Sequence, residues 1–196
     1  IDTGTNIENA VIAMVGTPGA TTVGTATTVG ATVIPVGNAA GFSAGQTIIS
    51  DEEPVDFFAN VISGAIKLTK TLPDGRQQIV GLLFAPDFLG RAYSKNNPYT
   101  AEAATDVEIC TFPNAAFERL VGEYPGLQQR LFQHTLDELD AARDWMLLLG
   151  RKTARERVAS FLLEMADRTA DTGTIELPMS RQDIADYLGL TIETVS

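Results

Sequence analysis

The sequence changes its pattern once, near residue 113, and this change limits the folds that the chain can adopt. Residues 46–112 hold short segments rich in β-branched and aromatic residues, separated by turn residues. Such segments favour β-strands, and Asp74–Gly75 between two of them indicates a tight hairpin. Residues 114–196 instead place apolar residues at helical spacing. The chain is therefore predicted to be an α+β protein in which a small barrel or roll of strands precedes several helices.

The composition excludes several classes of protein. No apolar run reaches the roughly 18 residues of a membrane span, and no secretory signal is visible. The single cysteine, Cys110, excludes an internal disulfide and fits a reducing cytoplasm. The only histidine, His134, has no ligand or catalytic partner at a familiar spacing. An enzyme is therefore not expected.

The charge of the chain is unevenly distributed. The net charge of −11 by itself argues against nucleic acid, because phosphate contacts need Lys and Arg. No Lys or Arg precedes Lys67, whereas residues 151–196 carry six basic against eight acidic side chains. A DNA-binding segment at the end of the chain is therefore not excluded by the net charge.

Residues 1–40 differ from the rest of the chain. They are rich in Thr, Gly, Ala and Val and nearly repeat themselves in TTVGTATTVGAT. This composition favours a few short strands or an extended leader. No chemistry is predicted there.

Residues 125–150 predict one long helix, with Pro125 in its first turn and Gly150 at its end. Its apolar stripe consists of Leu127, Leu131, Leu139, Ala142, Met146 and Leu149. The stripe either packs along the roll or forms a coiled-coil seam with a second copy, and the length of the helix favours the homodimer. Asp144 lies near the stripe, so it would face its own copy across the two-fold axis. Repulsion between the two carboxylates would make dimerisation conditional.

The last stretch, SRQDIADYLGLTIETVS, has the spacing of a helix-turn-helix. Ser180 suits a helix cap, Ala185 is small where two helices touch, and Gly189 tolerates the backbone of the turn. The residues predicted to point inward are Ile184, Leu188, Leu190 and Val195. Thr191 is predicted to cap the second helix, whose exposed face carries Ile192, Glu193 and Ser196. An ordinary helical hairpin is the alternative interpretation of this short pattern.

The order of these segments resembles the CRP/FNR family of transcription regulators, most closely the FNR branch of α-proteobacteria. The segments that carry the resemblance are FFANVISGAIKLTKTLPDGRQQIVGLLFAPDFLG, MLLLGRKTARERVASFLL and LPMSRQDIADYLGLTIETVS. It implies a β-roll of the cyclic-nucleotide-binding (jelly-roll) type over 41–124 and a dimerisation helix over 125–150. A winged helix-turn-helix DNA-binding domain is expected from residue 151, truncated at Ser196, after a leader (1–40) that is not family-like.

The resemblance also implies partners. In the family, an E-x-x-S-R sequence reads a TTGAT-type half-site, and Glu193 and Ser196 match its first two positions. The arginine that would follow lies beyond Ser196, so the chain as given is expected to bind DNA poorly. Thr191 and Arg181 are the other predicted DNA contacts. The exposed hairpin tip at Leu72, Pro73, Asp74 and Gly75 corresponds to a region that touches RNA polymerase in the family.

Two signals are considered for the roll. A cyclic nucleotide is not expected, because Arg91 and Tyr99 stand where the family has its ribose-binding Glu and phosphate-binding Arg. The FNR branch instead holds an oxygen-labile 4Fe-4S cluster on four cysteines, and Cys110 matches the cysteine of the roll. One thiolate cannot hold such a cluster. Either the chain is a cluster-free relative, or the cluster belongs to a parent whose cysteine-rich leader stands in place of residues 1–40. For this chain alone, Cys110 is predicted to be a buried strand residue packed in the roll. The alternative to a DNA-binding regulator is a truncated sensory or dimerisation module that binds protein but not DNA.

Overall fold

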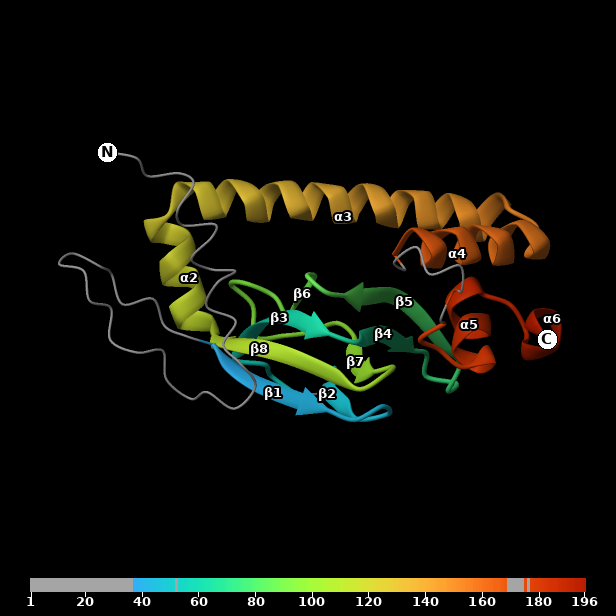
Figure 1. The fold of residues 1–196 in the computed structure, drawn as a ribbon, viewed down its shortest axis with the longest axis horizontal. Coiled ribbons are helices and arrows are strands. Elements are labelled where there is room, and N and C mark those ends of the chain that lie inside the picture. Colours follow the sequence, from blue (N-terminus) through green and yellow to red (C-terminus); the bar gives the residue numbers. More distant parts are fainter. Residues whose placement is uncertain (1–36, 52, 169–174, 176) are drawn as a thin grey trace.

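The structure, a computed structural model, describes residues 37–51, 53–168, 175 and 177–196. The predictions for residues 1–36 lie outside this part of the chain. Strands come first and helices follow, as Figure 1 shows. The strands are β1 (Asn38–Phe42), β2 (Thr47–Ile49), β3 (Phe57–Ser63), β4 (Ala65–Thr71), β5 (Gln77–Phe84), β6 (Phe88–Leu89), β7 (Thr100–Ala103) and β8 (Val107–Pro113). The helices are α2 (Asn114–Glu123), α3 (Pro125–Arg151), α4 (Ala154–Arg168), α5 (Arg181–Leu188) and α6 (Ile192–Val195).

The strands form two antiparallel sheets of four strands, in the orders β1-β8-β3-β6 and β2-β7-β4-β5. Alternate side chains of both sheets point into a shared apolar core, as expected when two half-buried sheets pack face to face. This roll core consists of Ile49, Val55, Ala59, Val61, Ile66, Leu83, Leu89, Ala101, Ala103, Val107 and Ile109. The predicted roll, and with it the α+β class, is confirmed.

The β4–β5 hairpin is the longest pairing of the second sheet, running from Ala65 opposite Phe84 to Thr71 opposite Gln77. Its turn closes through Gly75, whose φ of 86° is a conformation that glycine adopts without strain. The amide of Gly75 donates to the carbonyl oxygen of Leu72 at 2.9 Å. The hairpin signal in the sequence is therefore confirmed.

Asparagine is a common helix cap, and the segment NAAFERLVGEYP predicts that Asn114 caps α2, but this prediction is wrong. The cap position of α2 is Pro113, and Asn114 is the first helical residue. Asn114 is buried, and its amide Nδ2 lies 3.4 Å from the carbonyl oxygen of Val55. The side chain is thus drawn into the roll rather than onto the amides of its own helix.

Helix α3 has 27 residues and runs along one side of the roll for most of the length of the molecule (Figure 1). It extends past Gly150, the predicted end, and its cap is Lys152. At its N-terminal end Leu127 and Leu131 pack on a cluster built around Phe58, Phe117 and Val121. No helix among the described residues is long and apolar enough to cross a membrane.

A second large core lies at the other end of α3, where that helix meets β5, α4 and α5. We call it the junction core: it consists of Ile79, Leu82, Leu148, Phe161, Met165, Ile184, Tyr187 and Leu188. These residues belong to β5, α3, α4 and α5. The C-terminal helices therefore bury their apolar faces against the roll and α3 rather than only against one another.

Candidate DNA-binding and dimerisation surfaces

The α5–turn–α6 segment is a helix-turn-helix whose ends are fixed by hydrogen bonds. Ser180 and Asp183 form a capping box at the start of α5: the Ser180 hydroxyl accepts from the Asp183 amide, and the Asp183 carboxylate accepts from the Ser180 amide. Gly189 ends the helix with φ 60° and ψ 43°, the left-handed conformation that glycine tolerates. These predictions from the sequence are confirmed.

Apolar side chains hold α5 and α6 together. Ile184, Ala185 and Leu188 are buried, while Leu190 and Val195 are half-buried against the junction core. The small side chain at 185 leaves room for the turn, and the amide of Leu190 donates to the carbonyl of Ala185 at 2.9 Å. The inward set predicted from the sequence is thus the set that packs.

The outer face of α6 is open to solvent. Ile192, Glu193 and Ser196 are all exposed, as predicted. Hydrogen bonds from its own backbone amide and from Thr191 hold the pKa of Glu193 below its usual value. Glu193 therefore stays an ionised acceptor, the form that accepts from an amino group in the major groove.

Thr191 occupies the cap position of α6, but its side chain makes no capping bond to the helix. Its hydroxyl instead lies 3.1 Å from the hydroxyl of Thr194. Arg181, the first residue of α5, is exposed. The predicted DNA contacts Arg181, Thr191, Glu193 and Ser196 thus all lie at the surface.

Arg157 of α4 connects the end of α3 with the turn of the helix-turn-helix. Its guanidinium donates to the carbonyl oxygens of Leu149 at 2.6 Å, Lys152 at 3.0 Å, Leu188 at 3.0 Å and Gly189 at 3.4 Å. The last carbonyls of a helix have no partner within the helix. One arginine therefore satisfies carbonyls at the C-terminal ends of both α3 and α5, which the sequence alone did not reveal.

Aromatic rings make a second connection between α3 and α5. Trp145 stacks on Tyr187, with ring centroids 4.1 Å apart, and Phe161 meets Tyr187 edge-on at 5.9 Å. Offset stacking and edge-to-face contacts are the favourable geometries for aromatic pairs. The end of α3 and the first helix of the helix-turn-helix are thus in direct contact.

The predicted dimer stripe of α3 divides between two environments. Leu131 and Leu149 contact the apolar clusters of their own chain. Leu139, Ala142, Asp144 and Met146 are exposed. Three exposed apolar residues were missed: Phe132, Leu136 and Leu147. Phe132, Leu136, Leu139 and Met146 follow one another at steps of four, three and seven, the spacing of a coiled-coil seam.

The β4–β5 tip projects from the roll. Pro73, Asp74 and Gly75 are exposed, and Asp74 forms an ion pair with Arg76 at 2.8 Å. The hydrogen bonds from Arg76 hold the pKa of Asp74 below its usual value. The tip therefore presents a charged turn to solvent.

Cys110 lies on β8 and is half-buried, and burial raises the pKa of its thiol. A Cβ on Gly37, which precedes β1, would overlap the Cys110 sulfur. Among the described residues no three His, Cys, Asp or Glu side chains are grouped as metal ligands. The sequence holds one cysteine, so the residues present do not fit a four-iron cluster, which needs about four thiolates.

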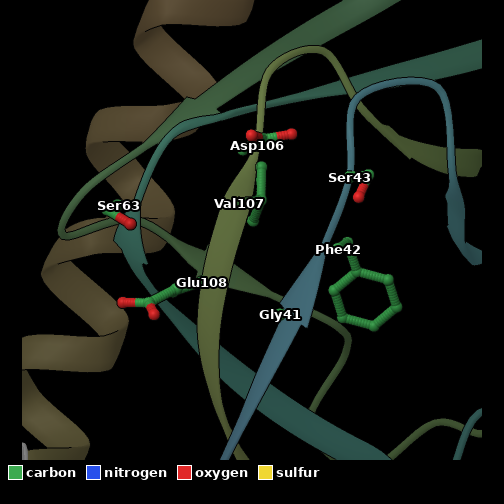
Figure 2. Close-up of a pocket in the computed structure, with 7 residues that line it drawn as sticks. All are labelled: Gly41, Phe42, Ser43, Ser63, Asp106, Val107 and Glu108. Carbon is green, nitrogen blue, oxygen red and sulfur yellow. The ribbon is translucent and has the colours of Figure 1, made fainter. Parts of the chain in front are cut away.

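A hollow of about 420 Å³ lies at the outer edge of the roll and is lined by Gly41, Phe42, Ser43, Ser63, Asp106, Val107 and Glu108. Figure 2 shows that Phe42 and Glu108 point away from each other. The Asp106 carboxylate already accepts from the amide of Ala44 at 3.1 Å. The hollow therefore has no convergent polar groups with which to fix a ligand.

Comparison with known proteins identifies both halves of this architecture. Residues 41–124 match the Cyclic nucleotide-binding domain family, and residues 156–196 match the Crp-like helix-turn-helix domain family. The chain is 53% identical over 157 residues to a probable transcriptional activator of Rhizobium leguminosarum bv. viciae, covering 78% of this chain and 65% of that protein. It is 49% identical over 163 residues to the transcriptional activator protein FnrL of Cereibacter sphaeroides, covering 79% and 66%.

The chain thus spans slightly less than two thirds of the length of these two relatives. Among solved structures, FixK2 of Bradyrhizobium japonicum is similar with a TM-score of 0.77 and 40% identity, covering 82% of this chain and 81% of that one. The resemblance noted in the sequence is confirmed on both domains and on the fold. The chain belongs to the CRP/FNR family, whose members are transcription regulators rather than enzymes.

Proposed function

We propose that the protein is a homodimeric transcription activator that binds TTGAT-type palindromic half-sites and contacts RNA polymerase in the cytoplasm. The observation that carries this proposal is the exposed face of α6. Helix α5 packs in the junction core, and the turn at Gly189 then directs α6 so that this face points to solvent. An exposed second helix after a tight turn is the element that enters the major groove in helix-turn-helix proteins. The names of the relatives, both activators, support the same function.

Base reading is tested in the full-length protein with Glu193→Gln. The carboxylate should accept from a cytosine amino group, so the substitution should cost about 1–3 kcal/mol of discrimination at one base pair. Affinities for the palindrome and for each single-base variant are measured at one salt concentration. Arg181→Ala is the control, because a lost phosphate contact should weaken binding to all sequences equally. Equal losses on every sequence for Glu193→Gln would make Glu193 a structural residue only.

Dimerisation through the exposed face of α3 is supported by Phe132 and Met146, which are 65% and 72% exposed on this helix. Large apolar side chains left in solvent in this way mark interaction surfaces. We expect Asp144→Ala to strengthen the dimer, because it removes a like-charge pair near the two-fold axis. Sedimentation equilibrium measures the dimer constant of the wild type and of the variant at the same salt concentration. A dimer that is unchanged or weaker in Asp144→Ala would contradict the repulsion.

The hairpin tip is proposed to contact RNA polymerase because it is exposed and lies at the end of the β4–β5 hairpin, free of the roll core. Substitution of Pro73, Asp74 and Gly75 should reduce transcription while promoter occupancy is unchanged. In vitro transcription and footprinting on the same promoter separate these two effects. If occupancy falls together with transcription, the tip serves folding.

We propose that the protein responds to oxygen or redox state, as the FNR branch does, with Cys110 as the roll ligand of a 4Fe-4S cluster in a parent that has a cysteine-rich leader. Gly37 supports this placement: a Cβ on it would overlap the Cys110 sulfur, so a leader joined before β1 would start beside the thiol. This chain alone, treated with iron and sulfide without oxygen, should stay colourless. The parent should turn brown and lose the colour in air, and Cys110→Ser should abolish the colour. Colour in the single-cysteine chain would contradict the proposal.

The alternative is a sensory or dimerisation module that binds protein but not DNA. The full-length protein distinguishes the two, because a module of this kind would dimerise and still leave promoter DNA unbound. We favour the DNA-binding regulator because the residues that would face DNA are exposed together on α5 and α6.

A further inference from the structure

An ion pair joins the roll directly to the helix-turn-helix. Lys67 of β4 places its Nζ 2.7 Å from Asp183 Oδ1 of α5 and 2.9 Å from Glu102 Oε1 of β7. The Lys67 and Asp183 side chains are only 16% and 21% exposed. A partly buried, hydrogen-bonded ion pair is screened less by water and salt than a surface pair is. The contact therefore constrains the position of α5 more than an exposed ion pair would.

The two oxygens of Asp183 have different partners. Oδ2 accepts from the Ser180 amide at 3.1 Å and from the Ser180 hydroxyl at 2.6 Å, whereas Oδ1 accepts from Lys67. Burial by itself would raise the pKa of Asp183, but the bonds from Lys67 and Ser180 outweigh it and lower the pKa. One carboxylate therefore caps α5 and fastens the start of that helix to the roll.

A second polar contact lies at the other end of α5. Gln78 of β5 donates from Nε2 to the carbonyl oxygen of Tyr187 at 3.1 Å. Between the two contacts, Ile79 and Leu82 of β5 pack with Ile184 and Tyr187 in the junction core. Helix α5 is thus held at its first turn, along its apolar face and at its last turn by a single hairpin.

The same hairpin ends in the exposed tip, and α5 continues through Gly189 into α6. We infer that Lys67 and Gln78 are positioning residues for DNA recognition: they fasten α5 to the β4–β5 hairpin, so that α6 and the hairpin tip keep one fixed relative orientation. This inference rests on the proposed function for its consequence, because it assumes that α6 reads DNA and that the tip contacts polymerase. The fastening itself does not depend on either activity.

The test uses the full-length protein with Lys67→Met and with Asp183→Asn, which loses the charge but keeps an oxygen that can accept from Ser180. Glu102→Gln and Lys70→Met are the matched controls. The first removes a Lys67 partner inside the roll, and the second removes an exposed lysine from the same strand. Hydrogen exchange of the α5 amides and the emission of Trp145, the only tryptophan, are measured without DNA. Affinity for the palindrome and the dimer constant are measured on the same samples.

Lys67→Met and Asp183→Asn should each speed exchange of the α5 amides, shift the Trp145 emission and weaken specific DNA binding about five- to tenfold. The dimer constant should not change, and the double variant should lose no more than either single variant. Lys67→Arg should keep most of the wild-type DNA affinity and most of the wild-type protection of the α5 amides. If Glu102→Gln matches Lys67→Met, Lys67 acts inside the roll and the inference is overturned. Unchanged exchange and emission would overturn it equally. Faster exchange in a protein that binds no DNA would support the fastening while the proposed function fails.

Discussion

The roll core and the junction core are built in different ways. The roll core takes its residues from the strands of the two sheets and the loop that enters β3, so it is complete within residues 49–109. The junction core takes residues from β5, α3, α4 and α5, which span Ile79 to Leu188. Helices as short as α5 and α6 are not stable alone. The C-terminal helices therefore depend on the roll for their packing, whereas the roll core is complete without them.

Removal of a large ring from the junction core should have the largest effect and should reveal this asymmetry. Phe161 is 1% exposed, so Phe161→Ala should cost about 3–5 kcal/mol of unfolding free energy through lost contacts and a cavity. Denaturant unfolding is followed by Trp145 emission for the junction and by pulse-labelled hydrogen exchange of the strand amides for the roll. The Trp145 transition should come first, at a lower denaturant concentration.

Ile109→Ala is the counterpart in the roll core, where Ile109 is fully buried. It should cost about 2–5 kcal/mol, and both signals should change together, because loss of the roll removes β5 from the junction. Coincident transitions in Phe161→Ala would show that the two cores unfold as one unit.

Arg157→Met should come next in size. The substitution leaves the carbonyls of Leu149, Lys152, Leu188 and Gly189 without their charged donor. It should lower the free energy of unfolding by about 2–3 kcal/mol, measured by denaturant unfolding followed by Trp145 emission. Arg157→Lys should recover only part of this stability, since an ammonium group cannot reproduce the planar fork of the guanidinium. Arg155→Met, an exposed neighbour on α4, should change stability by less than about 0.5 kcal/mol. Full stability in Arg157→Lys would mean that only the charge matters.

Ser180→Ala should have a smaller effect. Loss of the cap should cost about 1 kcal/mol and should speed exchange in the first turn of α5. Thr191→Ala is the matched comparison, because Thr191 stands at a cap position without a capping bond. Equal costs for the two substitutions would argue that Thr191 caps α6 in solution.

The smallest effect is a pH dependence of the roll–α5 ion pair. Because the pKa of Asp183 is lowered, its contribution to the free energy of unfolding is complete above the usual value of 3.8. This contribution is lost as the pH falls through the lowered pKa. Burial by itself would lower the pKa of Lys67, but Asp183 and Glu102 outweigh it and raise the pKa above 10.5. The Lys67 contribution is therefore complete below 10.5 and is lost above the raised pKa. The stability difference between wild type and Lys67→Met should be flat between these limits and shrink outside them. A difference that grows at either extreme would contradict the assignment.

Local signals in the sequence predicted much of the fold and of the site. Alternating segments predicted the roll, and Gly75, Ser180 and Gly189 marked a turn, a cap and a helix end by conformational needs that few residues meet. Asn114 does not cap α2: it is the first helical residue, and its side-chain amide faces the carbonyl oxygen of Val55 in the roll.

Contacts between distant parts of the chain could not be predicted from local pattern. Helical periodicity reveals that α3 has apolar faces, but it cannot assign a face to the protein's own core or to a partner. Leu131 was therefore predicted in the dimer stripe although it packs on its own chain, and the exposed Phe132 was missed. Lys67 and Asp183 lie 116 positions apart, and no spacing rule connects them. Three of the four predicted DNA contacts lie on α6 or at its caps, whereas the orientation of α6 depends on residues of the hairpin and α4.

Helix α3 is held by its own chain only near its two ends. Leu127 and Leu131 anchor one end and Leu148 and Leu149 the other, and every residue from Thr135 to Asp144 is exposed. A helix of 27 residues is about 40 Å long, so a tilt of roughly 5° at one anchor displaces the other by about 3–4 Å. The helix is in mechanical terms a lever with an unsupported span. A small local shift at the first anchor is therefore carried along the helix to Leu148 and Leu149, where it acts against the contacts that hold the helix-turn-helix to the roll.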